Sequence, residues 1–367
     1  MNKVFVSVLS LIALVFTLLS PASAQLLIGA KAAGMGGAGV ANVTDLSAVY
    51  YNPAGLMENT AKLAEMKISL GAAYSDPTTL QKSLTNAKDP AQFLLDNYAN
   101  NLNFNGTTDG IIGFNFAKIG ISVIPNIHAN VKKPANSTAG TFEGNGRYDV
   151  LLTLGTTIPV PFVGQLDIGA NAKSITDYRG SIEAVLDQAN PLLSTGTLYN
   201  HNGTGMGYDI GALASINIPM LTNVKVGYSM RDLSASIKYS NKSQLFYINK
   251  TTGTVTSDAQ QTLAETTSTL PTANVIGASA TIPVIGAAIA ADVESINGGS
   301  NTHVGIEYPI LMSAVILRAG SATGPALNMT TFGAKINFPV LTLDVAMISN
   351  NNDKALSQAV IDINIGL

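Results

Sequence analysis

The sequence has no cysteine and no tryptophan, and charged residues make up only 12% of its 367 positions. Without cysteine the chain can form no disulfide, no thiol nucleophile and no cysteine-ligated zinc or iron–sulfur site. An average soluble domain has about 25% charged residues, so little of this chain is suited to face water. Its 46% hydrophobic content and net charge of −3 also exclude a disordered chain, which needs the opposite composition.

Runs of basic residues and catalytic signatures are also missing. The 20 Lys and Arg are spread among 23 Asp and Glu, which excludes a nucleic acid partner. The histidines are His128, His201 and His303, far apart and without the spacing of metal ligands, and no Gly-x-Ser-x-Gly occurs. We therefore expect no catalytic residue, no metal and no cofactor, and we do not expect an enzyme.

The first 24 residues have the pattern of a secretory signal peptide. Lys3 precedes an apolar run from Val4 to Leu19, and Ala22-Ser23-Ala24 provides a small-x-small cleavage site. An uncleaved anchor is the alternative, but the run is short for a spanning helix of about 20 residues. We expect cleavage after Ala24, so that Gln25 becomes the first residue.

Most of the remaining chain alternates between apolar and polar residues with a period of two. Met66, Ile68 and Leu70 alternate with Glu65, Lys67 and Ser69, for example. A soluble β-sandwich would show this pattern too, but its strands average about 5–6 residues, and these segments are about twice as long. Residues 61–367 are therefore predicted to form an all-β fold, a transmembrane antiparallel β-barrel of about 14 strands, facing the lipids of a bacterial outer membrane.

The connections between predicted strands are long at one end of the barrel and short at the other. Five short turns have an apolar residue followed by proline, as in Ile282-Pro283, and they are assigned to the periplasmic side. The long outer connections include 76–108, with an amphipathic helix near Ala91 to Leu102, and 182–203, with a second helix near Ile182 to Leu193. The predicted strands are 62–75, 109–117, 119–130, 146–158, 165–181, 204–218, 222–240, 270–282, 286–297, 300–309, 312–321, 327–337, 340–349 and 357–367.

A glycine-rich segment lies between the signal peptide and the barrel. Its glycines fit the dinucleotide fingerprint G-x-G-x-x-G, but no strand precedes them, so nucleotide binding is not expected. We predict that residues 25–60 instead form a compact plug, because glycine lets backbones approach closely. The residues expected to define it are Gly34, Gly36, Gly37, Gly39, Asp45, Ser47, Asn52, Pro53, Ala54 and Gly55.

Gly34 to Leu56 closely resembles the N-terminal hatch of FadL-type long-chain fatty acid transporters and of their PorV/PorQ-like and TraF-like relatives. These families have Asp-x-Ser-Ala-x-x-x-Asn-Pro-Ala-Gly-Leu, which here runs from Asp45 to Leu56. Tyr208 to Ala212 and His303 to Tyr308 also resemble PorV-like strands. The chain departs from the pattern in ending on Leu367 rather than an aromatic residue, and in having no Trp at the membrane interface.

The resemblance implies two functions. A FadL-like barrel would transport hydrophobic compounds of the long-chain fatty acid class across the outer membrane. A PorV-like or TraF-like barrel would instead assist protein secretion or conjugal transfer, with components of those systems as partners. An apolar pocket at the hatch would favour the transporter, and an exposed patch of partner size would favour the scaffold.

Two features of the predicted wall bear on ligand passage. Pro125 falls in the middle of the third predicted strand, where a proline removes a ladder hydrogen bond and favours a kink. FadL-type barrels have a lateral exit at a kink in their third strand, so the resemblance implies an exit bordered by Pro125, Asn126 and His128. Alternatively, Pro125 simply ends the strand.

Four charged residues of the C-terminal strands are predicted to face the lumen, either as ion pairs or as substrate contacts: Glu307, Arg318, Lys335 and Asp344.

Overall fold

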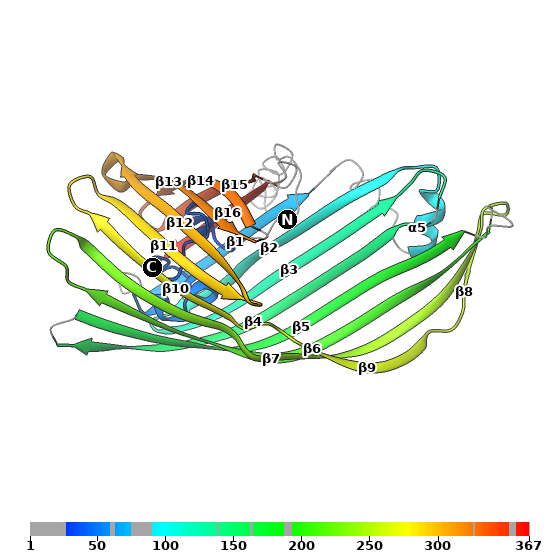
Figure 1. Cartoon of the computed structure of the whole chain (residues 1–367), viewed down its shortest axis with the longest axis horizontal. Coiled ribbons are helices and arrows are strands. Elements are labelled where there is room, and N and C mark those ends of the chain that lie inside the picture. Colours follow the sequence, from blue (N-terminus) through cyan, green and yellow to red (C-terminus); the bar gives the residue numbers. More distant parts are fainter. Residues whose placement is uncertain are drawn as a thin grey trace.

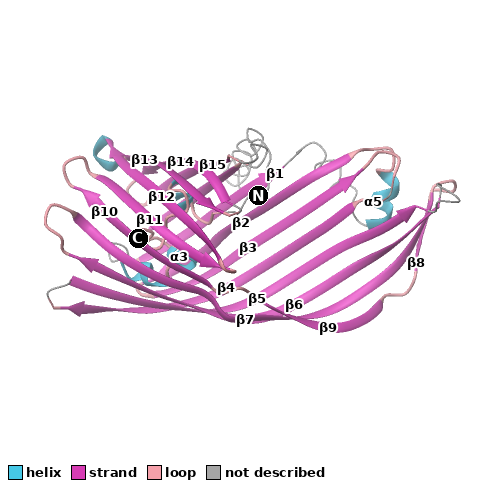
Figure 2. Ribbon diagram, in the orientation of Figure 1, coloured by secondary structure: helices cyan, strands magenta, loops and turns pink. Residues whose placement is uncertain are grey.

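A computed structural model describes residues 27–58, 63–74, 90–137, 139–161, 164–186, 193–325, 327–351 and 357–366. Nearly all of these residues belong to antiparallel strands, as Figures 1 and 2 show. No helix among them is both long and apolar enough to cross a membrane. The proposed signal peptide and its cleavage site lie outside the described residues, as does Leu367.

Fourteen of the described strands form a closed wall, which confirms the predicted fold class and strand number. Each pairs with the next along the chain, β16 returns to pair with β1, and β10 pairs with β7. Closure leaves the wall without a free sheet edge, which hydrocarbon would not tolerate. The wall strands are β1 (Ala64–Tyr74), β2 (Leu102–Phe116), β3 (Ile119–Lys133), β4 (Thr141–Val160), β5 (Gly164–Leu186), β6 (Leu193–Ile216), β7 (Thr222–Asn249), β10 (Ala273–Ile282), β11 (Ala287–Ile296), β12 (Gly299–Ile310), β13 (Val315–Gly324), β14 (Leu327–Asn337), β15 (Leu341–Asn350) and β16 (Gln358–Gly366).

The wall is much taller on one side than on the other. Strands β5 to β7 have 23, 24 and 28 residues, whereas β13 and β15 have 10 each. Figure 1 shows the long strands continuing past the short ones toward β8 (Thr254–Ser257) and β9 (Gln261–Thr269), which both pair with the far part of β7. The long strands therefore build an extension at the end that carries the long connections.

The two faces of the wall differ as the alternation predicts. On β1, Met66 and Ile68 are each 42% exposed on the outside, while Lys67 between them is buried inside. The same holds around the wall, with exposed Val, Ile, Leu, Phe and Tyr outside and charged residues inside. Tyr and Phe, including Tyr178, Tyr208 and Phe338, supply the exposed aromatic side chains. An apolar outer face and a polar lumen are characteristic of a barrel in a membrane.

The expected long loops were partly wrong, because much of their length is strand. Residues 182–186 and 193–203 extend β5 and β6, so the described ends of the helix expected over Ile182 to Leu193 are strand instead. Residues 241–269 include the end of β7 and strands β8 and β9. The Thr- and Asn-rich composition suggested solvated loops, but Thr is β-branched and favours strands once a partner is present. The predicted strand 270–282 begins only at Ala273, after Pro271.

The helix expected near Ala91 to Leu102 is shorter than predicted. Helix α5 spans Pro90–Asp96, and Leu102 already begins β2. Ala91, Phe93 and Leu94 pack against Leu102 and other apolar side chains of the extension. The apolar spacing therefore identified the helix correctly, and the first residues of β2 continued the same apolar surface.

Candidate functional site

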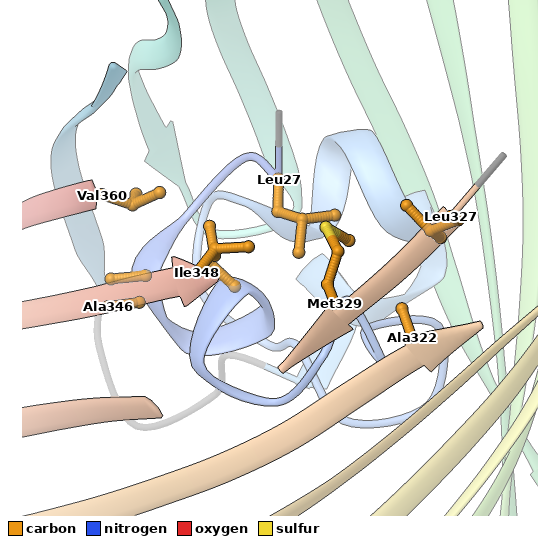
Figure 3. Close-up of a cluster of buried hydrophobic side chains, with 9 residues drawn as sticks. Leu27, Ala322, Leu327, Met329, Ala346, Ile348 and Val360 are labelled. Carbon is orange, nitrogen blue, oxygen red and sulfur yellow. The ribbon is translucent and has the colours of Figure 1, made fainter. Parts of the chain in front are cut away.

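The described part of the predicted plug, residues 27–58, lies inside the barrel; we call it the N-terminal segment. It contains helix α2 (Ala30–Gly34), helix α3 (Ala48–Tyr51) and the 3-10 helix η1 (Pro53–Glu58). On one side, Leu27, Ala30 and Ala33 pack against Met329, Ile348 and other residues of β13 to β16 (Figure 3). On the other side, η1 contacts β4, β5 and β6. The segment thus bridges opposite parts of the wall.

The glycines of the segment allow its backbone to touch the wall. Gly36 and Gly37 have φ of 70° and 88°, a region that L side chains rarely adopt. A Cβ on Gly36 would lie 2.4 Å from the Ser321 carbonyl oxygen, and one on Gly39 would lie 2.6 Å from the Tyr51 ring. Gly34 approaches the backbone of the wall in the same way, at Gly333. The predicted Gly34, Gly36, Gly37 and Gly39 therefore each occupy a position where a side chain would clash or crowd.

The wall contributes glycines of its own, which sequence reasoning missed. They face the segment, so a Cβ on any of them would lie 2.0 to 2.6 Å from an atom of the segment. The signal available in the sequence was one glycine at a lumen-facing position on each of five predicted strands. These are Gly169, Gly211, Gly227, Gly305 and Gly320.

Asn52 connects the segment to itself and to the wall. Its side chain is completely buried, and Nδ2 donates to the carbonyl oxygens of Val40 at 2.9 Å and Ala212 at 3.0 Å. Its Oδ1 accepts from the Ala54 N–H at 3.1 Å. Pro53 then begins η1, a position where its missing N–H costs nothing. Gly55 packs against the Val43 carbonyl, which leaves no room for a Cβ.

Asp45 anchors the segment through a buried lysine. Lys67 of β1 has no solvent-exposed surface, and its Nζ lies 2.8 Å from Asp45 Oδ2 and 2.7 Å from Asp362 Oδ2 of β16. Asp362 also accepts from the Ala30 N–H at 2.8 Å. Burial raises the pKa of Asp45, but the Lys67 ammonium and the Ser47 N–H outweigh it and hold that pKa well below its usual range. The Ser47 hydroxyl is buried and has no hydrogen-bond partner among the described residues.

Further polar anchors lie around the wall, and sequence reasoning did not assign them this role. Asp292 accepts from the N–H groups of Gly39 and Val40 at 2.6 and 2.9 Å. His303 Nδ1 lies 2.7 Å from the Gly36 carbonyl oxygen, so this nitrogen is the protonated one and donates. At the other end, Lys225 pairs with Glu58 at 2.7 Å. Each group is a charged or titratable residue at a lumen-facing position.

A cavity of about 430 Å³ lies in the lumen against the N-terminal segment; we call it the inner cavity. Its lining is mixed rather than purely apolar. Ile28 and Tyr50 come from the segment, and Ile124 and Leu151 come from β3 and β4. The charged part of the lining comes from the wall, and consists of Asp109, Arg147, Asp149, Lys173, Asp209, Arg231, Asp232 and Glu294.

A second cavity, of about 450 Å³, is lined by residues of the extension, among them Glu143, Arg179, His201 and Tyr239. Arg179 pairs with Asp177 at 2.9 Å, and its guanidinium lies 4.9 Å from the centre of the Tyr239 ring. Both cavities lie on the lumen side of β4 and β5. The lumen therefore has two hollows along its length, and the inner cavity touches the N-terminal segment.

Pro125 lies within β3 and does not end it. Its pairing with Tyr148 of β4 belongs to an uninterrupted ladder. On the other side, β2 pairs with β3 at Asp109–Asn126 and again at Ile112–Val123, and the two positions between them are unpaired in that ladder. Proline has no N–H to donate, which accounts for the interruption. Ile124 and Asn126 line the inner cavity beside it, and His128 lies farther along the lumen face of β3.

Three of the four other predicted lumen-facing charges form ion pairs, and the fourth, Lys335, lies opposite Asp344 in the β14–β15 ladder. Arg318 contacts Glu307 through Nε and Asp344 through Nη1, both at 2.6 Å. The paired-interior interpretation is therefore the one that the geometry supports. Within the described ranges, no group of three or more His, Asp or Glu side chains is arranged to hold a metal ion.

Comparison with known proteins identifies the fold. No family model matches the sequence, and no curated protein matches it. The toluene transporter TodX of Pseudomonas putida is 12% identical with a TM-score of 0.58, over 93% of this chain and 99% of that one. The toluene transporter TbuX of Ralstonia pickettii is 12% identical with a TM-score of 0.58, over 93% of this chain and 98% of that one. A FadL homologue of Pseudomonas aeruginosa is 12% identical with a TM-score of 0.56, over 94% of this chain and 99% of that one. At this identity the similarity shows a shared FadL-type fold, and it does not show the PorV-like or TraF-like part of the resemblance.

Proposed function

We propose that the chain is an outer-membrane transporter for hydrophobic small molecules. The observation that carries the proposal is the inner cavity, which touches the N-terminal segment on one side and the β2–β3 interruption on the other. Ligand would enter from the extension, rest in the inner cavity and leave between β2 and β3 at Pro125, with Asn126 and His128 near the exit. Two of the named structural neighbours, TodX and TbuX, are toluene transporters, which supports a hydrophobic cargo.

The size of the inner cavity bears on the cargo. Small-molecule sites typically measure about 300–1,000 Å³, so this cavity, at about 430 Å³, lies at the lower end. It suits a compound of one ring or a short chain. The sequence resemblance adds long-chain fatty acids as a finer candidate class, and the same experiment tests both.

Uptake into whole cells tests the function. Cells that express the chain should accumulate radiolabelled toluene or palmitate several-fold faster than cells with an empty vector, at equal surface levels of folded barrel. Mass spectrometry of lipid extracts from the purified protein would identify bound cargo. Uptake equal to the vector control for both compounds, with no compound in the extract, would contradict the proposal.

We also propose that residues 25–60 close the lumen as a plug, with residues 1–24 removed as a signal peptide and 61–367 forming the wall. The buried anchors of the N-terminal segment support this division. Deleting residues 29–58 should raise conductance in planar bilayers without unfolding the wall, since wall ladders do not depend on the segment. Unchanged conductance would mean that the segment does not block the passage.

A second function, as a component that assists secretion or conjugal transfer, is favoured by one observation. The short connections at one end of the barrel expose apolar side chains almost completely, among them Met220, Val284 and Met312. Apolar tips of this kind are suited to a protein partner. Disrupting the gene should then deplete proteins from the cell surface, and Met312→Asp should reproduce the depletion while leaving uptake intact. A normal surface proteome in both strains would exclude this function.

A further inference from the structure

The inner cavity contains a buried carboxyl group that no cation among the described residues neutralises. Asp109 of β2 lines the cavity and is only 4% exposed. Its Oδ1 is buried without a hydrogen-bond partner in the described part of the chain. The residue beside it on β1 is Gly71, whose missing side chain leaves Oδ1 open on that side. An unpartnered buried carboxylate is unfavourable, so the site gains when a donor reaches it.

The cations of the inner cavity are already bound to other carboxylates. Arg147 contacts Asp149 through two nitrogens, at 2.7 and 2.6 Å.

Lys173 lies between Asp209 at 2.9 Å and Asp232 at 2.7 Å. Arg231 pairs with Glu294, and its guanidinium also covers the ring of Tyr50 at 4.6 Å from the centre. The Tyr50 ring, which lines the cavity and could attract a ligand cation, is therefore already covered by Arg231, and Asp109 remains as the available acceptor.

The formal charge of the lining is negative. Three of its described residues carry a positive charge and five carry a negative charge, which leaves a net charge of −2. A ligand carboxylate would meet this excess and find every cation already paired. A ligand ammonium would be attracted by it, and its N–H groups match the oxygens of Asp109.

The rest of the lining provides an apolar surface for the body of such a ligand. Ile28, Ile124 and Leu151 belong to one buried apolar cluster, and Ala273 and Ile296 line the cavity from β10 and β11. We propose that the inner cavity selects small apolar amines in their ammonium form, with the ammonium donating to Asp109 and the hydrocarbon against these side chains. This inference rests on the proposed transport function and specifies its substrate class.

Three probes that share one ring test the selection: benzylamine, benzyl alcohol and benzoate. Binding to the purified full-length barrel in detergent is measured by equilibrium dialysis at neutral pH. Benzylamine should bind about tenfold more tightly than benzoate, as one charge-assisted hydrogen bond would give. Asp109→Asn should remove this advantage and change benzyl alcohol binding by less than about threefold.

Asp258→Asn is the matched control, because Asp258 is exposed on a connection and its removal changes the net charge equally. It should leave all three affinities unchanged. Heat-modifiable electrophoresis establishes that each variant is folded. The comparison of benzylamine with benzoate on the unmodified protein needs no variant.

Equal binding of benzylamine and benzoate, or benzylamine binding that survives Asp109→Asn, would overturn the selection. If uptake of toluene and palmitate also equals the vector control and no compound is found in the lipid extract, the transport function itself is wrong. If either compound is taken up, only the amine selection is wrong.

Discussion

At the scale of single residues, Asn52 shows how the N-terminal segment is fixed. One side chain completes hydrogen bonds to three backbone groups, in the segment at Val40 and Ala54 and in the wall at Ala212. Removing it would leave two buried carbonyl oxygens without that donor. The cost of a buried polar group left unsatisfied is about 1–3 kcal/mol, which is enough to loosen a short segment while a closed wall stays folded.

We therefore predict that Asn52→Ala raises the conductance of the barrel in planar bilayers and leaves heat-modifiable folding intact. Asn100→Ala, at an exposed site whose side chain donates to Asn97, is the control and should have no effect. If both variants conduct as the unmodified protein does, Asn52 does not hold the segment in place.

Asp45 makes the attachment of the same segment sensitive to acid. Because its pKa is lowered in the folded protein by Lys67, it contributes stability above its unfolded pKa of about 4, and this contribution is lost as the pH falls through the folded pKa. Conductance should therefore stay constant between pH 7 and pH 5 and rise below about pH 4. Asp45→Asn should conduct more already at pH 7 and show a shallower rise in acid. Identical profiles for the two proteins would contradict the role of this ion pair.

At the scale of elements, alternation predicted which residues face the lumen and how many strands close the wall. It did not predict strand length, because residues 241–249 and 261–269 have the composition of loops and become strands only through their partners. Residues 241–249 pair with β6 and β8, and residues 261–269 pair with 236–243 of β7. The glycines and the Asp45–Asn52 motif located the segment. Its partners Lys67, Asp292 and Asp362 could not be assigned, since nothing local in the sequence shows which lumen-facing residue a distant backbone N–H will reach.

Strand β3 has the element-scale property most relevant to transport. Pro125 interrupts pairing on the β2 side only, so a residue with an N–H should restore that ladder. We predict that Pro125→Val lowers uptake of labelled toluene toward the vector level, with normal amounts of folded protein. Pro339→Val, in a turn between β14 and β15, should not change uptake. Full uptake by the Pro125→Val barrel would reject an exit at this position and would favour the secretion-related function.

At the scale of the whole molecule, the short side of the barrel sets how it would sit in a membrane. The exposed apolar residues of β15 are Leu343, Val345 and Met347, and the strand ends soon after them. On the long side, the outer face of β7 carries the exposed Lys238, which pairs with Glu265 of β9 at 2.6 Å, and the exposed Ser240 follows on the same face of the strand. A single apolar belt can therefore include Val345 while the extension, with Lys238 and Ser240, stands in water.

This arrangement predicts opposite tolerance to charge at two exposed positions of the outer face. Val345→Arg would place a cation against lipid, at a cost of about 2–4 kcal/mol near the bilayer midplane, so the urea concentration at which the barrel unfolds from vesicles should fall clearly. Ser240→Arg adds the same charge to the water-exposed part of β7, and this variant should unfold at the same urea concentration as the unmodified protein. The measurement is the loss of heat-modifiable mobility with increasing urea. If both variants unfold together with the unmodified protein, the short side is not covered by lipid; if both are equally destabilised, the extension is immersed as well, and ligand would have to enter through the membrane rather than from outside it.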